Sequence, residues 1–266
     1  MHAARPYTVP DAPETGTIAL CDESMRRDTA TSGVYLLSSV IVPLGALPAV
    51  RERMTGLRLP GQRKKLHWRD ESAARRALAA DGLAALDADI VIATWCGMSQ
   101  DKQERARRKA LETLLLDLAR RSVRRALFES RGPDRDRADV ASLAGLRRSG
   151  ILPPSLRVHH APGGDEHALW AADIAAGAYN AAMGGTCAHW EKALEGSKGT
   201  VLPCGACGTP HTLRPRSGRI PAEKARRPGV RRPADGLAPL PAPPGVGNTS
   251  TLPPRPPGVK RKVSHE

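Results

Sequence analysis

The stretch Thr17-Ile18-Ala19-Leu20-Cys21-Asp22-Glu23-Ser24 decides the fold of this chain. Five residues compatible with β-structure follow a glycine and end in two adjacent acids, a pattern typical of a buried strand. Carboxylates at the end of a buried strand place negative charge at the edge of a sheet, where a metal ion can neutralise it. Asp22 and Glu23 are therefore candidate site residues, with a solvated strand end or a helix cap as the plain alternative. Neighbouring strand residues face opposite sides, so Glu23 is expected to point away from Asp22.

The rest of the chain alternates between strand and helix patterns. A second β-rich run follows at 33–42 and predicts an antiparallel hairpin with the first. Further strands are predicted at 65–68, 90–96, 123–129 and 156–160, and helices at 47–57, 70–86, 103–121, 134–148 and 166–183. This alternation predicts the α/β class, with a mixed sheet flanked by helices.

Composition separates the last quarter of the chain from the rest. Residues 197–266 hold 13 of the 41 Lys and Arg residues, 14 of the 24 prolines and only 3 of the 27 acids. Such a segment buries too little apolar surface to offset its chain entropy, so we expect a disordered basic tail. The predicted organisation is a flexible N-terminus at 1–15, a folded domain at 16–196 and the tail at 197–266.

Neither the cysteines nor the apolar runs indicate secretion or membrane insertion. Five cysteines are scattered along the chain, and no basic segment leads into an apolar stretch near Met1. We therefore expect no disulfide framework, and a cytoplasmic protein. No apolar run approaches the roughly 20 residues that cross a bilayer, so no membrane partner is expected. The sequence leaves the oligomeric state open.

Two further acids are candidate partners of Asp22 in a metal site. Glu129 ends a later predicted strand, although a surface ion pair with Arg125 or Arg131 would also explain it. Asp173 lies in an apolar, alanine-rich helix. Because an unpaired buried charge is costly, Asp173 must be paired with a cation or bound to a metal.

Taken together, these features resemble domain-of-unknown-function family 3800, which is similar in fold to ribonuclease H and is regarded as a family of metal-dependent nucleases. The resemblance covers roughly residues 17–183. The segments that carry it are Asp22-Glu23-Ser24, Lys65-Leu66-His67, Glu129 and Ala172-Asp173. It implies a ribonuclease H-like domain in which Asp22, Glu129 and Asp173 are the site acids. The chain departs from the family pattern at Met25, where the family usually has Gly, and at Glu129, where it often has Asp.

The chemistry of phosphodiester hydrolysis suits these residues. Two divalent ions about 3.5 to 4 Å apart stabilise the charge on the attacking and leaving oxygens. Carboxylates are ligands that Mg²⁺ and Mn²⁺ prefer, so Asp22 is expected to bridge two ions that Glu129 and Asp173 each help to hold. His67 is a candidate for proton transfer or for contact with the scissile phosphate. The plain alternative for His67 is a structural histidine in a strand.

The sequence therefore predicts a Mg²⁺- or Mn²⁺-dependent nuclease acting on DNA or RNA. The alternative is a catalytically inactive ribonuclease H-like module that binds nucleic acid or a protein partner. The basic tail is compatible with phosphate binding, but a solubilising linker, or a segment without a selected role, explains it better. Other histidine- and cysteine-containing groups are weaker signals. His159, His160 and His167 with Asp165 carry no metal assignment, and Cys204 and Cys207 with His211 form only half of a zinc pattern.

Overall fold

The computed structural model describes residues 15–27, 33–61, 65–99 and 102–204. Almost all of the predicted flexible N-terminus, and the tail from residue 205 onward, lie outside the described residues.

A six-stranded mixed sheet forms the centre of the described part of the chain, in the order β5-β4-β1-β2-β3-β6. Its strands are β1 (Thr17–Arg27), β2 (Gly33–Pro43), β3 (Asp89–Cys96), β4 (Arg125–Glu129), β5 (Arg157–Ala161) and β6 (Lys198–Cys204). The predicted hairpin is confirmed, since β1 and β2 pair antiparallel over 11 positions. Strand β3 continues the antiparallel part, whereas β1, β4 and β5 run parallel to one another.

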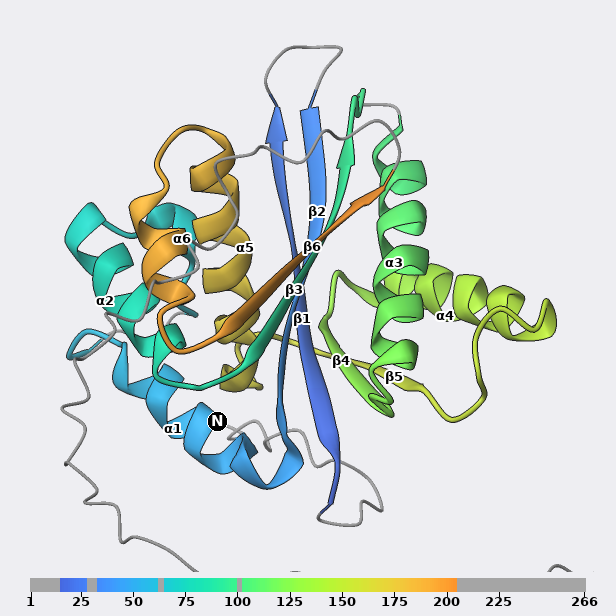
Figure 1. Cartoon of the computed structure of the whole chain (residues 1–266), viewed down its shortest axis with the longest axis horizontal. Helices are drawn as coiled ribbons and strands as arrows, with labels where there is room; N and C mark the ends of the chain where they lie inside the picture. Colours follow the sequence, from blue (N-terminus) through green and yellow to red (C-terminus); the bar gives the residue numbers. More distant parts are fainter. Residues whose placement is uncertain (1–14, 28–32, 62–64, 100–101, 205–266) are drawn as a thin grey trace, which may run out of the picture. The chain divides into compact units, whose positions relative to one another are not determined.

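Helices cover both faces of this sheet (Figure 1). On one side lie α1 (Leu47–Gly56), α2 (Ala73–Ala84), α5 (Trp170–Met183) and α6 (Ala188–Ala193), and on the other α3 (Gln103–Arg120) and α4 (Pro133–Arg148). The alternation of β1 explains the two layers, because Ile18 and Leu20 pack toward α5 whereas Ala19 and Cys21 pack toward α3. The predicted α/β class, a mixed sheet flanked by helices, is confirmed.

Helix α5 approaches its neighbours closely because its side chains are small. A Cβ atom at Gly177 would lie 2.1 Å from Cγ of Trp68, so only glycine leaves room for that ring. The indole is buried and belongs to the same apolar cluster as α5. This contact brings the segment around Trp68 against the helix that carries Asp173.

The predicted short strand at 65–68 is wrong. Residues 65–67 have no regular structure, and Trp68–Asp70 forms a single 3-10 turn. The apolar alternation is nevertheless real, since Leu66 and Trp68 are buried and His67 is exposed. The backbone of this segment has a different partner, because the N–H of Trp68 donates to Asp173 rather than to a neighbouring strand.

The predicted domain boundary at residue 196 is also wrong. Residues 198–204 form β6, which pairs parallel with β3 over seven positions at the sheet edge. Composition placed this segment with the proline-rich tail, but Thr200, Val201 and Leu202 are half-buried and extend the sheet. None of the helices in the described ranges combines the length and the apolar character that a membrane crossing needs.

Candidate active site

All five sequence-predicted site residues line one pocket of about 600 Å³, although the carboxylate of Glu23 reaches away from it to Arg107. Asp22 lies in β1 on the face toward α5, Glu129 is the last residue of β4, and Asp173 lies in the first turn of α5. His67 and its neighbour Lys65 enter from the segment before α2. The fold therefore gathers three acids from two neighbouring parallel strands and one helix.

Lys65 lies between two of these acids, a role that its sequence context did not reveal. Its ammonium group contacts the carboxylate of Glu129, and its Nζ lies 3.7 Å from Oδ2 of Asp22. The Lys65 side chain is only 10% exposed. Burial alone would lower the pKa of Lys65, but the charges of Asp22, Asp173 and Glu129 raise it above its ordinary value. Lys65 therefore stays charged and supplies a buried cation to this pocket.

The two buried aspartates are costly to ionise. Burial raises the pKa of Asp22 well above its ordinary value, the charge of Glu129 raises it further, and Lys65 opposes both effects. Burial also raises the pKa of Asp173, against the opposing effects of Lys65 and the N–H of Trp68, which donates to its Oδ2 at 2.9 Å. Raised carboxylate pKa values in a pocket are a frequent property of functional sites.

The carboxylates of this pocket suit a divalent ion, but in this structure Asp22 and Glu129 are spaced around the ammonium of Lys65. Hard divalent ions prefer carboxylate oxygens as ligands, and three carboxylates face this pocket. Within the described ranges, however, no three His, Cys, Asp or Glu side chains stand close enough to hold a metal ion as they are placed. Binding an ion at Asp22 and Glu129 would therefore require the ammonium of Lys65 to leave them.

Glu129 has a different partner from the surface arginines that its sequence neighbourhood suggested. Its carboxylate pairs with Lys65, while Arg131 pairs with Glu104 at 3.0 Å. Gly163 packs against the same carboxylate, since a Cβ atom there would lie 2.7 Å from Oε1 of Glu129. The side chain is held between a glycine and a lysine, and it faces the pocket.

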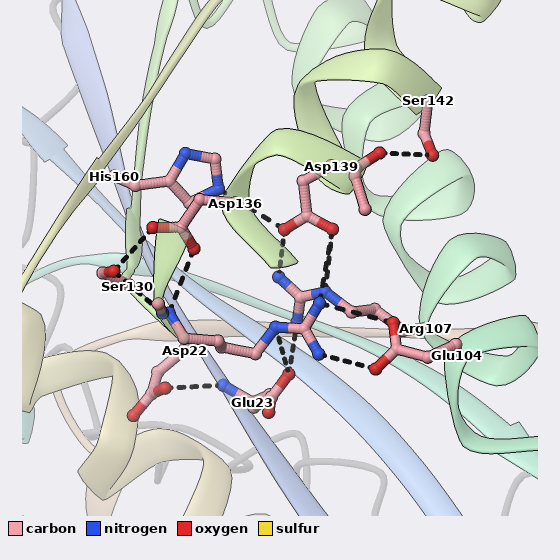
Figure 2. A network of polar contacts seen from close by, with 12 residues as sticks. Asp22, Glu23, Glu104, Arg107, Ser130, Asp136, Asp139, Ser142 and His160 are labelled. Atoms are coloured by element: carbon pink, nitrogen blue, oxygen red, sulfur yellow. Dashed lines mark hydrogen bonds and ion pairs between the residues drawn. The ribbon is translucent and has the colours of Figure 1, made fainter. Parts of the chain in front are cut away.

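Glu23 belongs to a separate network on the opposite face of the sheet, as its strand position predicted. Figure 2 shows its side chain reaching toward Arg107, while the neighbouring Asp22 points elsewhere. The guanidinium of Arg107 also binds Asp139, with Nε 3.0 Å from Oδ1 and Nη2 2.5 Å from Oδ2. Burial opposes ionisation of Asp139, but hydrogen bonds from His160 and Arg107 hold its pKa well below the ordinary value. The structure therefore does not bring the carboxylate of Glu23 together with the other three.

The peptide bond between Asp22 and Glu23 links the acidic pocket on one face of the sheet to the Arg107 network on the other. The N–H of Glu23 donates to Oδ1 of Asp22 at 2.8 Å, so the residue anchored on one face helps to hold the acid on the other. The sequence could not predict this network, because Arg107 and Asp139 lie on helices distant in the chain. Arg107 is nearly fully buried, although it is a charged residue on α3.

Three arginines add positive charge to the pocket that holds the acids. Arg26, Arg69 and Arg76 are among its lining residues. Arg76 is held in place, because its Nε donates to the carbonyl of Trp68 at 3.0 Å and its Nη2 to that of Arg69 at 2.9 Å. The side chain of Arg69 is 95% exposed. The arginines in this lining suit a ligand that carries negative charge.

The remaining histidines and cysteines form no metal group among the described residues. His167 contacts Thr55 at 3.2 Å and Arg58 at 2.9 Å, and burial followed by the charge of Arg58 lowers its pKa. Cys204 is a buried free thiol at the end of β6, and its predicted partners Cys207 and His211 lie outside the described residues. Cys96 is disulfide-bonded, which the scattered cysteine positions did not indicate.

Comparison with known proteins adds little to this geometry. No family model matches the chain, so the resemblance to family 3800 stays a prediction. No curated protein matches it either. A solved structure of a mutant Bst-RNase HIII protein is similar with a TM-score of 0.36 and 13% sequence identity, over 66% of this chain and 57% of that protein. A similarity at this level carries no functional argument, so function must be inferred from the residues of this chain.

Proposed function

We propose that the acidic pocket hydrolyses phosphodiester bonds of DNA or RNA with the help of Mg²⁺ or Mn²⁺. The observation that carries this proposal is the convergence of Asp22, Glu129 and Asp173 on one pocket whose lining also holds arginines. Hard divalent ions prefer carboxylate oxygens, and buried carboxylates with raised pKa values gain most from a nearby cation. The resemblance to family 3800 agrees with this reaction.

The three carboxylates are the residues that would hold the metal. When bound, divalent ions supply charge stabilisation for the attacking and leaving oxygens and activate water. Asp22 is central in this arrangement, because its ionisation is affected by both Glu129 and Asp173. Lys65 contacts Asp22 and Glu129 and reduces the repulsion between these two acids in the absence of an ion.

His67 and the arginines act on the substrate in this proposal. His67 is exposed at the pocket and close enough to Asp173 for its charge to affect that acid, so it is suited to hold a proton near the leaving oxygen. Arg69 and Arg76 present guanidinium groups that bind phosphate oxygens and orient the backbone without reading its sequence.

Cleavage assays with a matched acid control test this function. The full chain is incubated with labelled single- and double-stranded DNA and RNA, in Mg²⁺, in Mn²⁺ and in EDTA. We expect cleavage that requires a divalent ion, that Asp22→Asn abolishes and that the exposed control Glu52→Gln retains. Calorimetric titration with Mn²⁺ should show binding to the wild type and not to Asp22→Asn. Equal cleavage by wild type and Asp22→Asn would refute the assignment.

A catalytically inactive binding module is the second candidate, and Lys65 is the observation that favours it. The lysine already pairs with Asp22 and Glu129, so the pocket is partly neutral without any ion. In this case the protein binds nucleic acid and never cleaves it. A truncation after Cys204 tests how much the basic tail contributes to nucleic acid binding. The cut is placed there because a cut at residue 196 would also remove β6 from the sheet. Binding that persists without cleavage in any divalent ion favours the module.

A further inference from the structure

A second pocket lies at the other end of the parallel strands, away from the acids. It has a volume of about 450 Å³ and forms where β1, β4 and β5 begin. The described residues of its lining are mainly arginines and hydroxyl-bearing residues, with no acid among them: Thr15, Gly16, Thr17, Ser122, Arg124, Arg125, Ser155 and Arg157. Among the residues that the structure describes, the pocket therefore presents three arginines and no carboxylate.

Two of the arginines lie directly opposite each other in the sheet. Arg125 and Arg157 are register partners at the start of β4 and β5, so their side chains project from the same face. Like charges directly opposite on neighbouring strands destabilise a sheet. No acid in the described part of the pocket lining compensates for this repulsion.

The three guanidinium groups also have no partners among the described residues. Arg124, Arg125 and Arg157 make no side-chain hydrogen bond or ion pair there, whereas Arg107 and Arg131 each bind two acids or more. The positive potential extends along β5 to His159, two residues beyond Arg157. Burial lowers the pKa of His159, and the charges of His160, Arg125 and Arg157 lower it further.

We propose that this arginine pocket binds a phosphate group. Arginine presents a planar fork of N–H donors that matches phosphate oxygens, and the serine and threonine hydroxyls supply further donors around the same volume. A carboxylate has two oxygens and is satisfied by one arginine, whereas three arginines and several hydroxyls suit a group with more acceptor oxygens and more charge. A bound phosphate also removes the repulsion between Arg125 and Arg157.

The phosphate has two possible sources, which share this chemistry. One is a small phosphate compound, and the other is the backbone of a nucleic acid strand. Arg125 and Glu129 lie on the same face of β4, four residues and therefore roughly 13 Å apart. A nucleic acid strand bound at both pockets would have to span this distance, and this second source alone rests on the proposed function.

The test compares two double variants that remove the same charge. Arg125→Gln with Arg157→Gln removes the opposed pair, and Arg53→Gln with Arg148→Gln removes two exposed arginines elsewhere. All measurements use the full chain in EDTA, where a metal-dependent enzyme cannot cut. Thermal unfolding is followed with inorganic phosphate and with sodium chloride at the same ionic strength. Fluorescence anisotropy follows the binding of a labelled ten-nucleotide oligothymidylate from low to high salt.

Phosphate should raise the Tm of the wild type and of the control variant, and leave that of Arg125→Gln/Arg157→Gln unchanged. Without phosphate, the opposed-pair variant should have the higher Tm, because the repulsion is gone. If the source is a nucleic acid strand, the salt slope of this variant for the oligonucleotide falls by about 0.7, the change expected when one phosphate is no longer neutralised. An unchanged slope together with an abolished phosphate response assigns a small phosphate compound instead.

The same response to phosphate in both double variants would overturn the proposal, whatever the nuclease assays show. Should the double variant fail to fold, Arg157→Gln alone replaces it, because this residue is exposed at the start of an edge strand. An undiminished phosphate response in that single variant has the same meaning.

Discussion

Replacing Lys65 by methionine removes the ammonium between two site acids and keeps most of the apolar stem. At the observed 3.7 Å from Asp22, the pair is worth about 4.5 kcal/mol in Coulomb energy if the effective dielectric constant is about 20. The desolvation cost of the ammonium offsets part of this energy. Since the variant leaves Glu129 and Asp22 uncompensated, we expect a net loss of about 3 kcal/mol of stability at neutral pH.

A divalent ion should reverse this loss, because it supplies the missing positive charge. If the ammonium and the ion compete for the same carboxylates, removing about 3 kcal/mol of competition tightens the binding of Mn²⁺ by roughly 100-fold. Urea unfolding in EDTA and in Mn²⁺ measures the stability, and calorimetric titration measures the affinity. The loss should also shrink toward acidic pH. A carboxyl with a raised pKa in the folded state binds more protons folded than unfolded, so its contribution is present at low pH and is lost as pH rises through that pKa.

The control is Lys192→Met, which removes a lysine that pairs with acids at the surface and lies 42% exposed. Mn²⁺ should change the stability of this control only as much as it changes that of the wild type. The reasoning about Lys65 is refuted if Lys65→Met binds Mn²⁺ no more tightly than the wild type. It is equally refuted if Mn²⁺ leaves the stability of the variant as low as EDTA does.

Three further substitutions probe the rest of the site. Asp22→Asn removes a carboxyl that is costly to ionise, so at neutral pH without metal the variant should be about 1 kcal/mol more stable than the wild type. By calorimetry this is a rise of roughly 2 to 4 °C in Tm. A lower Tm would contradict this. Gly177→Ala places a methyl group 2.1 Å from a ring atom of Trp68, so the free energy of unfolding measured in urea should fall by about 1 to 3 kcal/mol. An unchanged urea midpoint would contradict this. Arg107→Met leaves Asp139 charged and buried, so about 3 to 5 kcal/mol should be lost at pH 7. In the wild type the lowered pKa of Asp139 contributes stability above its unfolded pKa of about 3.9, which is lost as pH falls through the folded value, so the two proteins should converge in acid.

The sequence predicted those parts of the fold that depend on local pattern. Apolar runs of strand length ended in Asp22 and Glu129, and the buried surroundings of Asp173 showed that this acid needs a partner. The hairpin and the alternation of strands and helices indicated the α/β class. Strand β6 was missed, because composition assigned its residues to the tail and its pairing with β3 depends on a segment about 100 residues earlier.

The partners of the acids could not be predicted in the same way. Lys65 lies in a segment without regular structure, and its contacts with Asp22 and Glu129 follow from where that segment packs. The backbone of Trp68 satisfies Asp173, which no side-chain pattern reveals. Local periodicity indicates which residues are buried, whereas the identity of a buried charge's partner depends on tertiary packing.

The adjacency of Asp22 and Glu23 makes the alignment of β1 a condition for both charge groups. Side chains of a strand alternate between faces, so a slip of one position against β2 would carry each acid to the opposite layer. The glutamate would then enter the pocket of Lys65, and the aspartate would face Arg107. The register of the long hairpin thus determines which face of the sheet each acid lies on. A single inserted or deleted residue in this hairpin should consequently damage the protein more than most substitutions within it.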